Sequence, residues 1–192
     1  MFISYQEFEE NLSRVQASIL AAEQKSGRLA GSVRLLPVTK NHPVDAALYA
    51  FRSGLKSVGE NRVQEALSKM DDADSAMGWE LIGPLQSNKA KKVAECFDRV
   101  QSVDRAKVAK ALQRYASEAE RNLGVLLQIN AGADPNKSGA SLEEASALME
   151  CALGQSNLKI DGLMTIAPLD DDPAVARACF AALRKCRDRL EA

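Results

Sequence analysis

Short apolar runs alternate with helix-like segments along this 192-residue chain. The apolar runs are RLLPVT, KSVG, WELIG, DRVQSV, GVLLQI and KIDGLMTI. A segment with helical periodicity follows each run, from VDAALYAFRS after the first to PAVARACFAALRKCRDRL after the last. Such alternation predicts a parallel sheet, because each helix is the crossover that returns the chain to the start of the next strand. The pattern therefore places the chain in the α/β class.

A parallel sheet of this kind can be an open doubly wound sheet or a (β/α) barrel. No Gly-x-Gly-x-x-Gly and no Walker-type loop follows any predicted strand, which weakens the dinucleotide and NTPase interpretations of an open sheet. We therefore expect one domain over residues 1–192 with a TIM-type barrel fold. A complete barrel needs eight strand–helix units in about 250 residues. Six units predict a barrel that is incomplete at its C-terminal end and has two edge strands.

An extra helix is expected ahead of the first strand, ending near Gly27. Apolar residues recur there at spacings of three and four, which predicts an amphipathic helix with one buried stripe. The stripe consists of Tyr5, Phe8, Leu12, Val15, Ile19 and Ala22.

Composition excludes several classes of function. A formal net charge of −1, a single Trp and the lack of a basic tract argue against nucleic acid as a partner. No apolar run approaches the roughly eighteen residues of a membrane span, and no signal-peptide pattern is present, so we expect a soluble cytoplasmic protein. The four cysteines form no Cys-x-x-Cys pair, and His42 is the only histidine. A metal site or a Ser/His/Asp triad is therefore not expected.

In a barrel, functional residues collect where strands end. The predicted strand ends carry polar groups that we expect to line one pocket, although the same positions also serve as helix N-caps. These positions are Lys40, Glu60, Asn61, Pro84 to Asn88, Asp104, Asn130, Met164 and Thr165.

Lys40 is the only amine among the first three of these strand ends. It is either a lysine whose stem lies along the rim with a solvated ammonium, or a partly desolvated amine able to attack an aldehyde. Spacing alone favours the solvated lysine.

For Asn61, capping and ligand binding stay equally open, whereas Asp104 is expected to cap its helix. Lys137, in the DPNKSGA turn, is either part of a solvated turn, the favoured interpretation, or a second amine at the pocket mouth.

The motifs around these positions resemble one family. VTK at the first strand end, VGENRVQE at the second and IGPLQSNK at the third, followed in order by QINAGADPNKSG and DGLMTIAP, resemble the YggS/PROSC family of pyridoxal 5′-phosphate homeostasis proteins. The resemblance extends from the N-terminal helix to the end of the chain. It implies a barrel similar to the N-terminal domain of alanine racemase.

The resemblance also implies a cofactor and its site. Pyridoxal phosphate would be held as a Schiff base on Lys40, with Asn61 and Met164 contacting it and with a less definite part for Lys137. It implies a carrier in vitamin B6 homeostasis without catalytic turnover, acting as a monomer or weak dimer. Pyridoxal-phosphate-dependent apo-enzymes would be the recipients of the cofactor.

This chain departs from the family pattern in two places. WELIGPLQ carries Glu80 and Leu81 where relatives have a histidine and an aromatic or apolar residue. Relatives also continue through Ser-Met-Gly-Met-Ser and Arg-Ile-Gly segments that bind the phosphate, and these are not in this sequence. Two alternatives therefore stay open, namely a racemase-like enzyme and a form that no longer binds the cofactor. The racemase is disfavoured because the three tyrosines, which could supply a second acid/base, lie in predicted helices.

Overall fold

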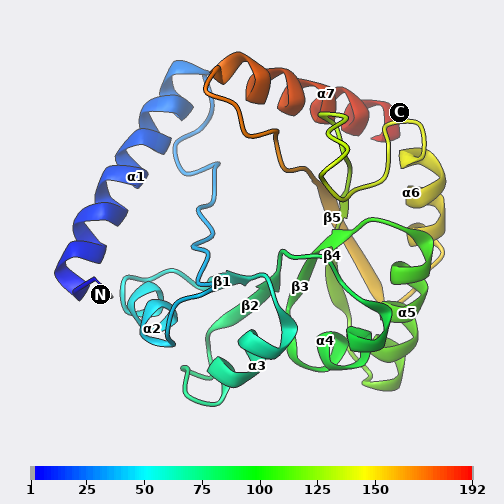
Figure 1. The fold of residues 1–192 in the computed structure, drawn as a ribbon, viewed down its shortest axis with the longest axis horizontal. Coiled ribbons are helices and arrows are strands. Elements are labelled where there is room, and N and C mark those ends of the chain that lie inside the picture. Colours follow the sequence, from blue (N-terminus) through cyan, green and yellow to red (C-terminus); the bar gives the residue numbers. More distant parts are fainter. Residues whose placement is uncertain (1–2, 192) are drawn as a thin grey trace.

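Five parallel strands form the sheet of the computed structural model, which describes residues 3–191. Each strand pairs with the next in sequence order, the arrangement of a (β/α) barrel (Figure 1). This confirms the predicted α/β class and its parallel sheet. The strands are β1 (Ser57–Glu60), β2 (Gly78–Leu81), β3 (Arg99–Val103), β4 (Leu123–Gln128) and β5 (Leu158–Met164).

The first predicted strand, RLLPVT, is not a regular strand. It contributes a single bridge, in which Val38 lies beside Gly59 of β1, with backbone hydrogen bonds from Thr39 N–H to Gly59 O and from Gly59 N–H to Pro37 O. Pro37 has no N–H to donate, which limits how far the ladder can extend. Residues 34–39 therefore lie along the edge of the sheet and are tied to it only near their end.

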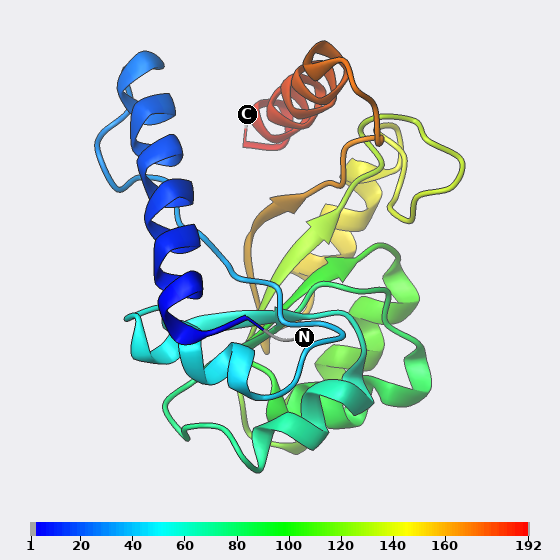
Figure 2. The same cartoon turned by 60° about the vertical axis from the view of Figure 1, so that its left-hand side comes forward.

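Helices return the chain between strands and cover one side of the sheet (Figures 1 and 2). Fully buried side chains of the strands, such as Val58, Leu81, Val100 and Leu127, pack against small and branched residues of these helices. The helices are α2 (Asp45–Arg52), α3 (Val63–Met70), a 3₁₀ turn η1 (Ser87–Lys89) leading into α4 (Ala90–Cys96), α5 (Ala106–Glu118), α6 (Ala145–Leu153) and α7 (Pro173–Glu191).

The first helix, α1 (Tyr5–Lys25), begins with a capping box formed by Ser4 and Glu7, but its predicted burial is wrong. Val15 is 44% exposed, and Glu23 is the only buried residue of the helix. Figures 1 and 2 show the reason, because α1 stands away from the strands. Periodicity predicted the helix correctly, whereas burial of its apolar stripe needs a neighbouring surface that residues 3–191 do not supply.

Two contacts at its ends hold α1. At its start, Tyr5 packs edge-on against Tyr49 of α2, with ring centroids 5.2 Å apart, and bonds through its hydroxyl to Ser53 Oγ at 3.1 Å. At its end, the Glu23 carboxylate accepts hydrogen bonds from Gly31 N–H at 2.9 Å and from Val33 N–H at 2.6 Å. A buried carboxylate therefore folds the connecting loop back onto the helix.

The Glu23 contacts predict a pH-dependent loop. The Gly31 N–H, and next the Val33 N–H, hold the pKa of the Glu23 carboxyl below its ordinary value of 4.5. Because this pKa is lowered on folding, the contribution to stability is present above 4.5 and is lost as pH falls through the folded-state pKa. An NMR titration of the Gly31 and Val33 amides should show a midpoint below 4.5, and Glu23→Gln should abolish it. Glu9→Gln, at an exposed glutamate of α1, is the control, and a midpoint at or above 4.5 would contradict the assignment.

Candidate functional site

Lys40 lies at the tip of a tight turn directly after the Val38 bridge. The turn is closed by a hydrogen bond from His42 N–H to Thr39 O at 3.2 Å, and Asn41 adopts a left-handed conformation with φ of 62°. Asn tolerates this region better than most residues with a side chain. Lys40 is exposed, and within residues 3–191 no group bonds to its ammonium. Its amine is therefore accessible at the carboxyl end of the first strand segment.

A buried ionic cluster lies beneath this turn. Lys69 Nζ of α3 donates to Glu60 Oε1 at 2.7 Å, to Thr39 O at 2.8 Å and to Glu65 Oε1 at 2.9 Å. Glu60, the last residue of β1, is thus paired with a lysine of α3. Sequence reasoning missed Lys69, although its i,i+4 spacing from Glu65 could have indicated an ion pair.

Some of the predicted strand ends, but not all of them as expected, meet at one cavity of about 510 Å³. Asn61 after β1, Pro84 after β2 and Asp104 after β3 line it, with Ser138 from the loop after β4. Arg62, Lys89 and Arg105 also face it, so its rim is mainly cationic. Lys40 and Met164 are not among the residues that line it.

Neither Asn61 nor Asp104 caps a helix. The residues at the N-caps of α3 and α5 are Arg62 and Arg105, and neither makes a side-chain cap bond. The predicted cap role of Asp104 is therefore wrong, since its carboxylate binds the guanidinium of Arg105 at 2.6 and 2.8 Å. For Asn61, the capping alternative is removed and its side chain is left for ligand contact.

Asn130 and Lys137 belong to the loop after β4. The Asn130 amide donates to Asp134 O at 2.8 Å and accepts from Asp134 N–H at 3.1 Å, so it shapes the loop. Lys137 N–H donates to Asp134 O at 3.0 Å, which confirms the predicted turn. The Lys137 side chain is half-buried, next in sequence to Ser138 at the cavity.

Met164 is the last residue of β5 and is half-buried. Its carbonyl accepts from Ile129 N–H at 2.9 Å, which fixes its position beside the end of β4. The carboxyl ends of the parallel strands therefore lie close to four candidate residues. These are Lys40, Asn61, Lys137 and Met164, each of which ends a strand or follows one.

One face of the sheet carries charged side chains. Glu80 of β2 is 3% exposed, and its Oε1 accepts from Ser57 at 3.1 Å and from Arg99 at 3.3 Å. Arg99 also pairs with Asp161 of β5 at 2.8 Å. This face of the sheet is therefore held by ion pairs rather than by apolar contacts. Glu80, one of the departures from the family pattern, is the centre of an ion-pair ladder.

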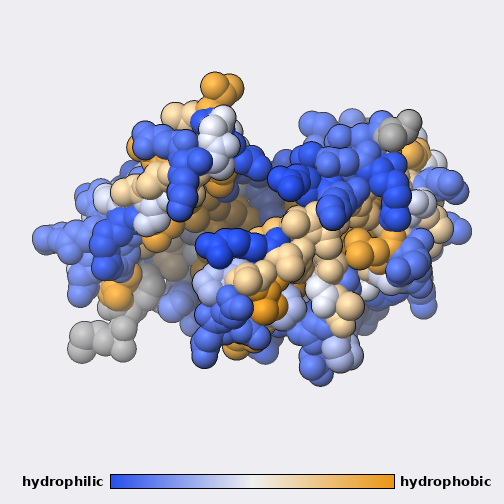
Figure 3. Space-filling view, turned by 90° about the horizontal axis from the view of Figure 1, so that it is seen from above, coloured by the Kyte–Doolittle hydropathy of each residue, from blue (hydrophilic) through white to orange (hydrophobic). Residues whose placement is uncertain are grey.

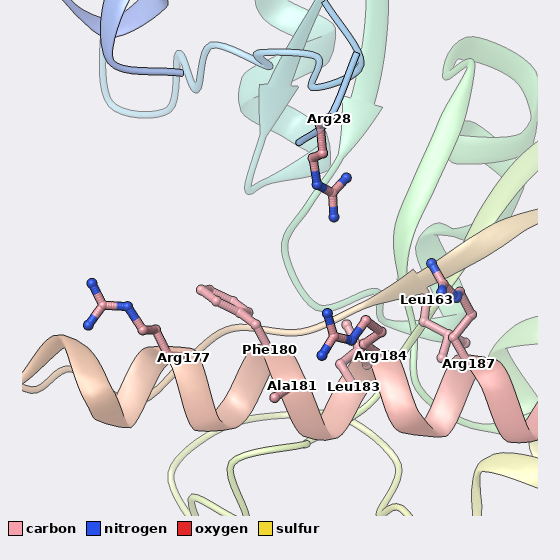
Figure 4. Close-up of a pocket in the computed structure, with 8 residues that line it drawn as sticks. All are labelled: Arg28, Leu163, Arg177, Phe180, Ala181, Leu183, Arg184 and Arg187. Atoms are coloured by element: carbon pink, nitrogen blue, oxygen red, sulfur yellow. The ribbon is translucent and has the colours of Figure 1, made fainter. Parts of the chain in front are cut away.

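A second cavity, of about 470 Å³, lies along α7 and contains arginines but no lysine (Figure 4). Arg28, Arg177, Arg184 and Arg187 line it beside Phe180, which is 53% exposed. Figure 3 shows the surface hollowed between the part formed by α1 and the part formed by α7. Guanidinium groups stay protonated and do not attack aldehydes. This cavity is therefore not the aldehyde site.

Residues 3–191 contain neither a cluster of metal-ligating side chains nor a membrane-spanning helix. No group of three or more His, Cys, Asp and Glu side chains is arranged to hold a metal ion. No helix in that range has both the length and the apolar character needed to cross a membrane.

Comparison with known proteins identifies the family. The family model of the alanine racemase N-terminal domain matches residues 3–192. The pyridoxal phosphate homeostasis protein of Pseudomonas aeruginosa is 41% identical over 92% of this chain and 77% of its own. The chain belongs to the pyridoxal phosphate homeostasis protein family.

Solved structures agree with this family membership. A protein of Bifidobacterium adolescentis described as unknown is 33% identical, with a TM-score of 0.90 over 98% of this chain and 81% of its own. PipY of Synechococcus elongatus, solved with pyridoxal phosphate bound, is 36% identical, with a TM-score of 0.76 over 92% of this chain and 82% of its own.

The close approach of Gly83 to Asn61 predicts one sensitive position. A Cβ at Gly83 would lie 2.6 Å from Asn61 Oδ1 and would overlap the Asn61 carbonyl oxygen. Gly83→Ala should therefore displace Asn61 and destabilise the protein by about 1–3 kcal/mol in urea unfolding. Gly154→Ala, whose added Cβ meets only ordinary contacts at 3.6 Å and beyond, should leave stability unchanged or slightly higher. Equal stability of the two variants would contradict the packing described at Asn61.

Proposed function

We propose that this chain binds pyridoxal 5′-phosphate through Lys40 and acts in cytoplasmic vitamin B6 homeostasis, without catalytic turnover. The observation that carries the proposal is the free, exposed amine of Lys40 at a strand end. Family membership supports it, because curated relatives are pyridoxal phosphate homeostasis proteins and PipY was solved with the cofactor bound.

The residues around the strand ends fit this cofactor. A primary amine is required to attach an aldehyde, and Lys40 supplies one that no other group in residues 3–191 occupies. Lys40 would hold the cofactor through its side-chain nitrogen, and the cofactor would supply the aldehyde carbon for that attachment.

The neighbouring residues have distinct parts in the proposal. The Asn61 amide, which caps no helix, would hydrogen-bond the cofactor, and the Met164 side chain would contact it from the end of β5. Arg62, Lys89 and Arg105 around the nearby cavity would attract the anionic phosphate. Lys137 would lie at the mouth of the site, beside Ser138. Bound cofactor supplies an electrophilic aldehyde and an electron-accepting ring.

The tyrosines support a carrier rather than a racemase-type enzyme. Such a catalyst needs a second acid/base opposite the lysine. Tyr5 bonds Ser53 and lies under the Arg52 guanidinium, whose carbon is 4.1 Å from the ring centroid. Tyr49 is in α2 and packs on Tyr5, while Tyr115 is in α5 beneath Arg114. All three tyrosines are therefore on helices with other contacts, and the cofactor would pass to an apo-enzyme instead of reacting on this chain.

A visible-absorption titration tests the proposal. Adding pyridoxal phosphate to the wild-type chain should produce an imine band that Lys40→Ala abolishes. Lys56→Ala, at another exposed lysine in this part of the chain, should keep the band. A band of full strength in Lys40→Ala would contradict the site, and amino-acid racemisation at ordinary enzymatic rates of about 1 s⁻¹ or more would contradict the carrier role.

A further inference from the structure

We infer that Glu65 and Lys69 are positioning residues, which hold the turn around Lys40 in the orientation that cofactor attachment needs. The positioning role rests on the proposed function, whereas the contacts of Glu65 and Lys69 with the turn do not depend on it. Both residues lie on α3, and neither is among the cofactor-contacting residues proposed above.

Lys69 fixes the residue before Lys40. Its three ammonium hydrogens match three oxygen acceptors, and one of them is the Thr39 carbonyl at 2.8 Å. The Thr39 hydroxyl donates to Glu60 Oε1 at 2.6 Å and the Thr39 N–H donates to Gly59 O at 3.1 Å. Every polar group of Thr39 is thus bonded, and these bonds fix the position of Thr39 where the chain enters the turn.

Glu65 fixes the residue after Lys40. Its Oε1 accepts the Asn41 N–H and, at 2.9 Å, the Lys69 ammonium. Asn41 has the left-handed φ of 62°, which residues with a side chain adopt infrequently and which surrounding contacts must hold. The two residues that flank Lys40 are therefore both tied to α3, while the Lys40 side chain itself stays free.

Stability alone does not explain this cluster. Glu60 is fully buried, and its Oε2 has no partner within residues 3–191. A buried ion pair of this kind is often no more stabilising than apolar residues of similar volume. Fixed polar networks do, however, hold functional groups in one geometry, which speeds a reaction that needs a defined approach. Within residues 3–191, the backbone groups that the Lys69 and Glu65 side chains bond belong only to Thr39 and Asn41, on either side of Lys40.

The test compares Glu65→Ala with Glu65→Gln and with Glu95→Ala. Glu65 is part-exposed, with 20% of its side chain accessible, so removing it leaves the buried Lys69–Glu60 pair intact. Glu65→Gln keeps a neutral acceptor for the Asn41 N–H. Among the described residues, the Glu95 carboxylate of α4 forms ion pairs only with the exposed Lys91 and Lys92, so its loss controls for the removal of a helix carboxylate.

Three quantities are measured on each variant. Amide hydrogen exchange of Asn41 should be about tenfold faster in Glu65→Ala, from the loss of a charge-assisted bond, and intermediate in Glu65→Gln. The rate of Lys40 acetylation by a small reagent is measured relative to that of Lys56 in the same mass-spectrometric digest. This ratio should differ from that of the wild type most in Glu65→Ala and less in Glu65→Gln. The midpoint of the pyridoxal phosphate titration should rise several-fold in Glu65→Ala and stay unchanged in Glu95→Ala.

Different outcomes separate this inference from the proposed function. Unchanged Asn41 exchange in Glu65→Ala overturns the inference, and so does faster exchange with an unchanged titration midpoint. If wild type forms no band, the proposed function fails and the positioning role fails with it, while the exchange rates still test the contacts themselves. A double variant, Glu60→Met with Lys69→Met, leaves neither partner of the buried pair. It should fold and show the same altered Lys40 acetylation, since Thr39 has lost both side-chain partners.

Discussion

Parallel pairing of β1 to β5, with the Val38 bridge that adds residues 34–39 beside β1, determines the position of every candidate residue in this protein. Because all strands run in the same direction and the helices return the chain, the carboxyl ends of the strands all lie at the same end of the sheet. Lys40, Asn61 and Met164 are far apart in sequence, yet each follows or ends a strand there. A change in the direction of one strand would move its residue to the opposite end of the strands, away from the other candidate residues.

The alternation of strands and helices, and with it the position of Lys40 at a strand end, could be predicted from periodicity. The two predictions that failed, one of strand pairing and one of helix burial, depend on neighbouring residues that sequence periodicity does not specify. RLLPVT has the composition of a strand, but Pro37 removes a donor and the segment pairs only at Val38. The stripe on α1 has the period of a buried face, but that face has no covering surface in residues 3–191.

Charged residues were the hardest to place from sequence. Asp104 was expected to cap a helix, but it lies one residue before the N-cap of α5, and its carboxylate binds the Arg105 guanidinium. Lys69 was missed because a lysine on an amphipathic helix is normally solvated. It is 6% exposed because the helix-facing side of β1 carries Glu60, and a buried carboxylate requires a cation. The buried lysine and the exposed lysine thus have separate parts, Lys69 in the scaffold and Lys40 in the proposed chemistry.

Chemical trapping of the attachment point tests the central claim most directly. The full chain would be incubated with pyridoxal phosphate, reduced with borohydride to make the linkage permanent, digested, and mapped by tandem mass spectrometry. The structure and the family together predict a single modified residue, Lys40, in proportion to the loss of the imine band. Modification mainly at Lys137 or another lysine, or none at a concentration that gives the full band, would contradict the account.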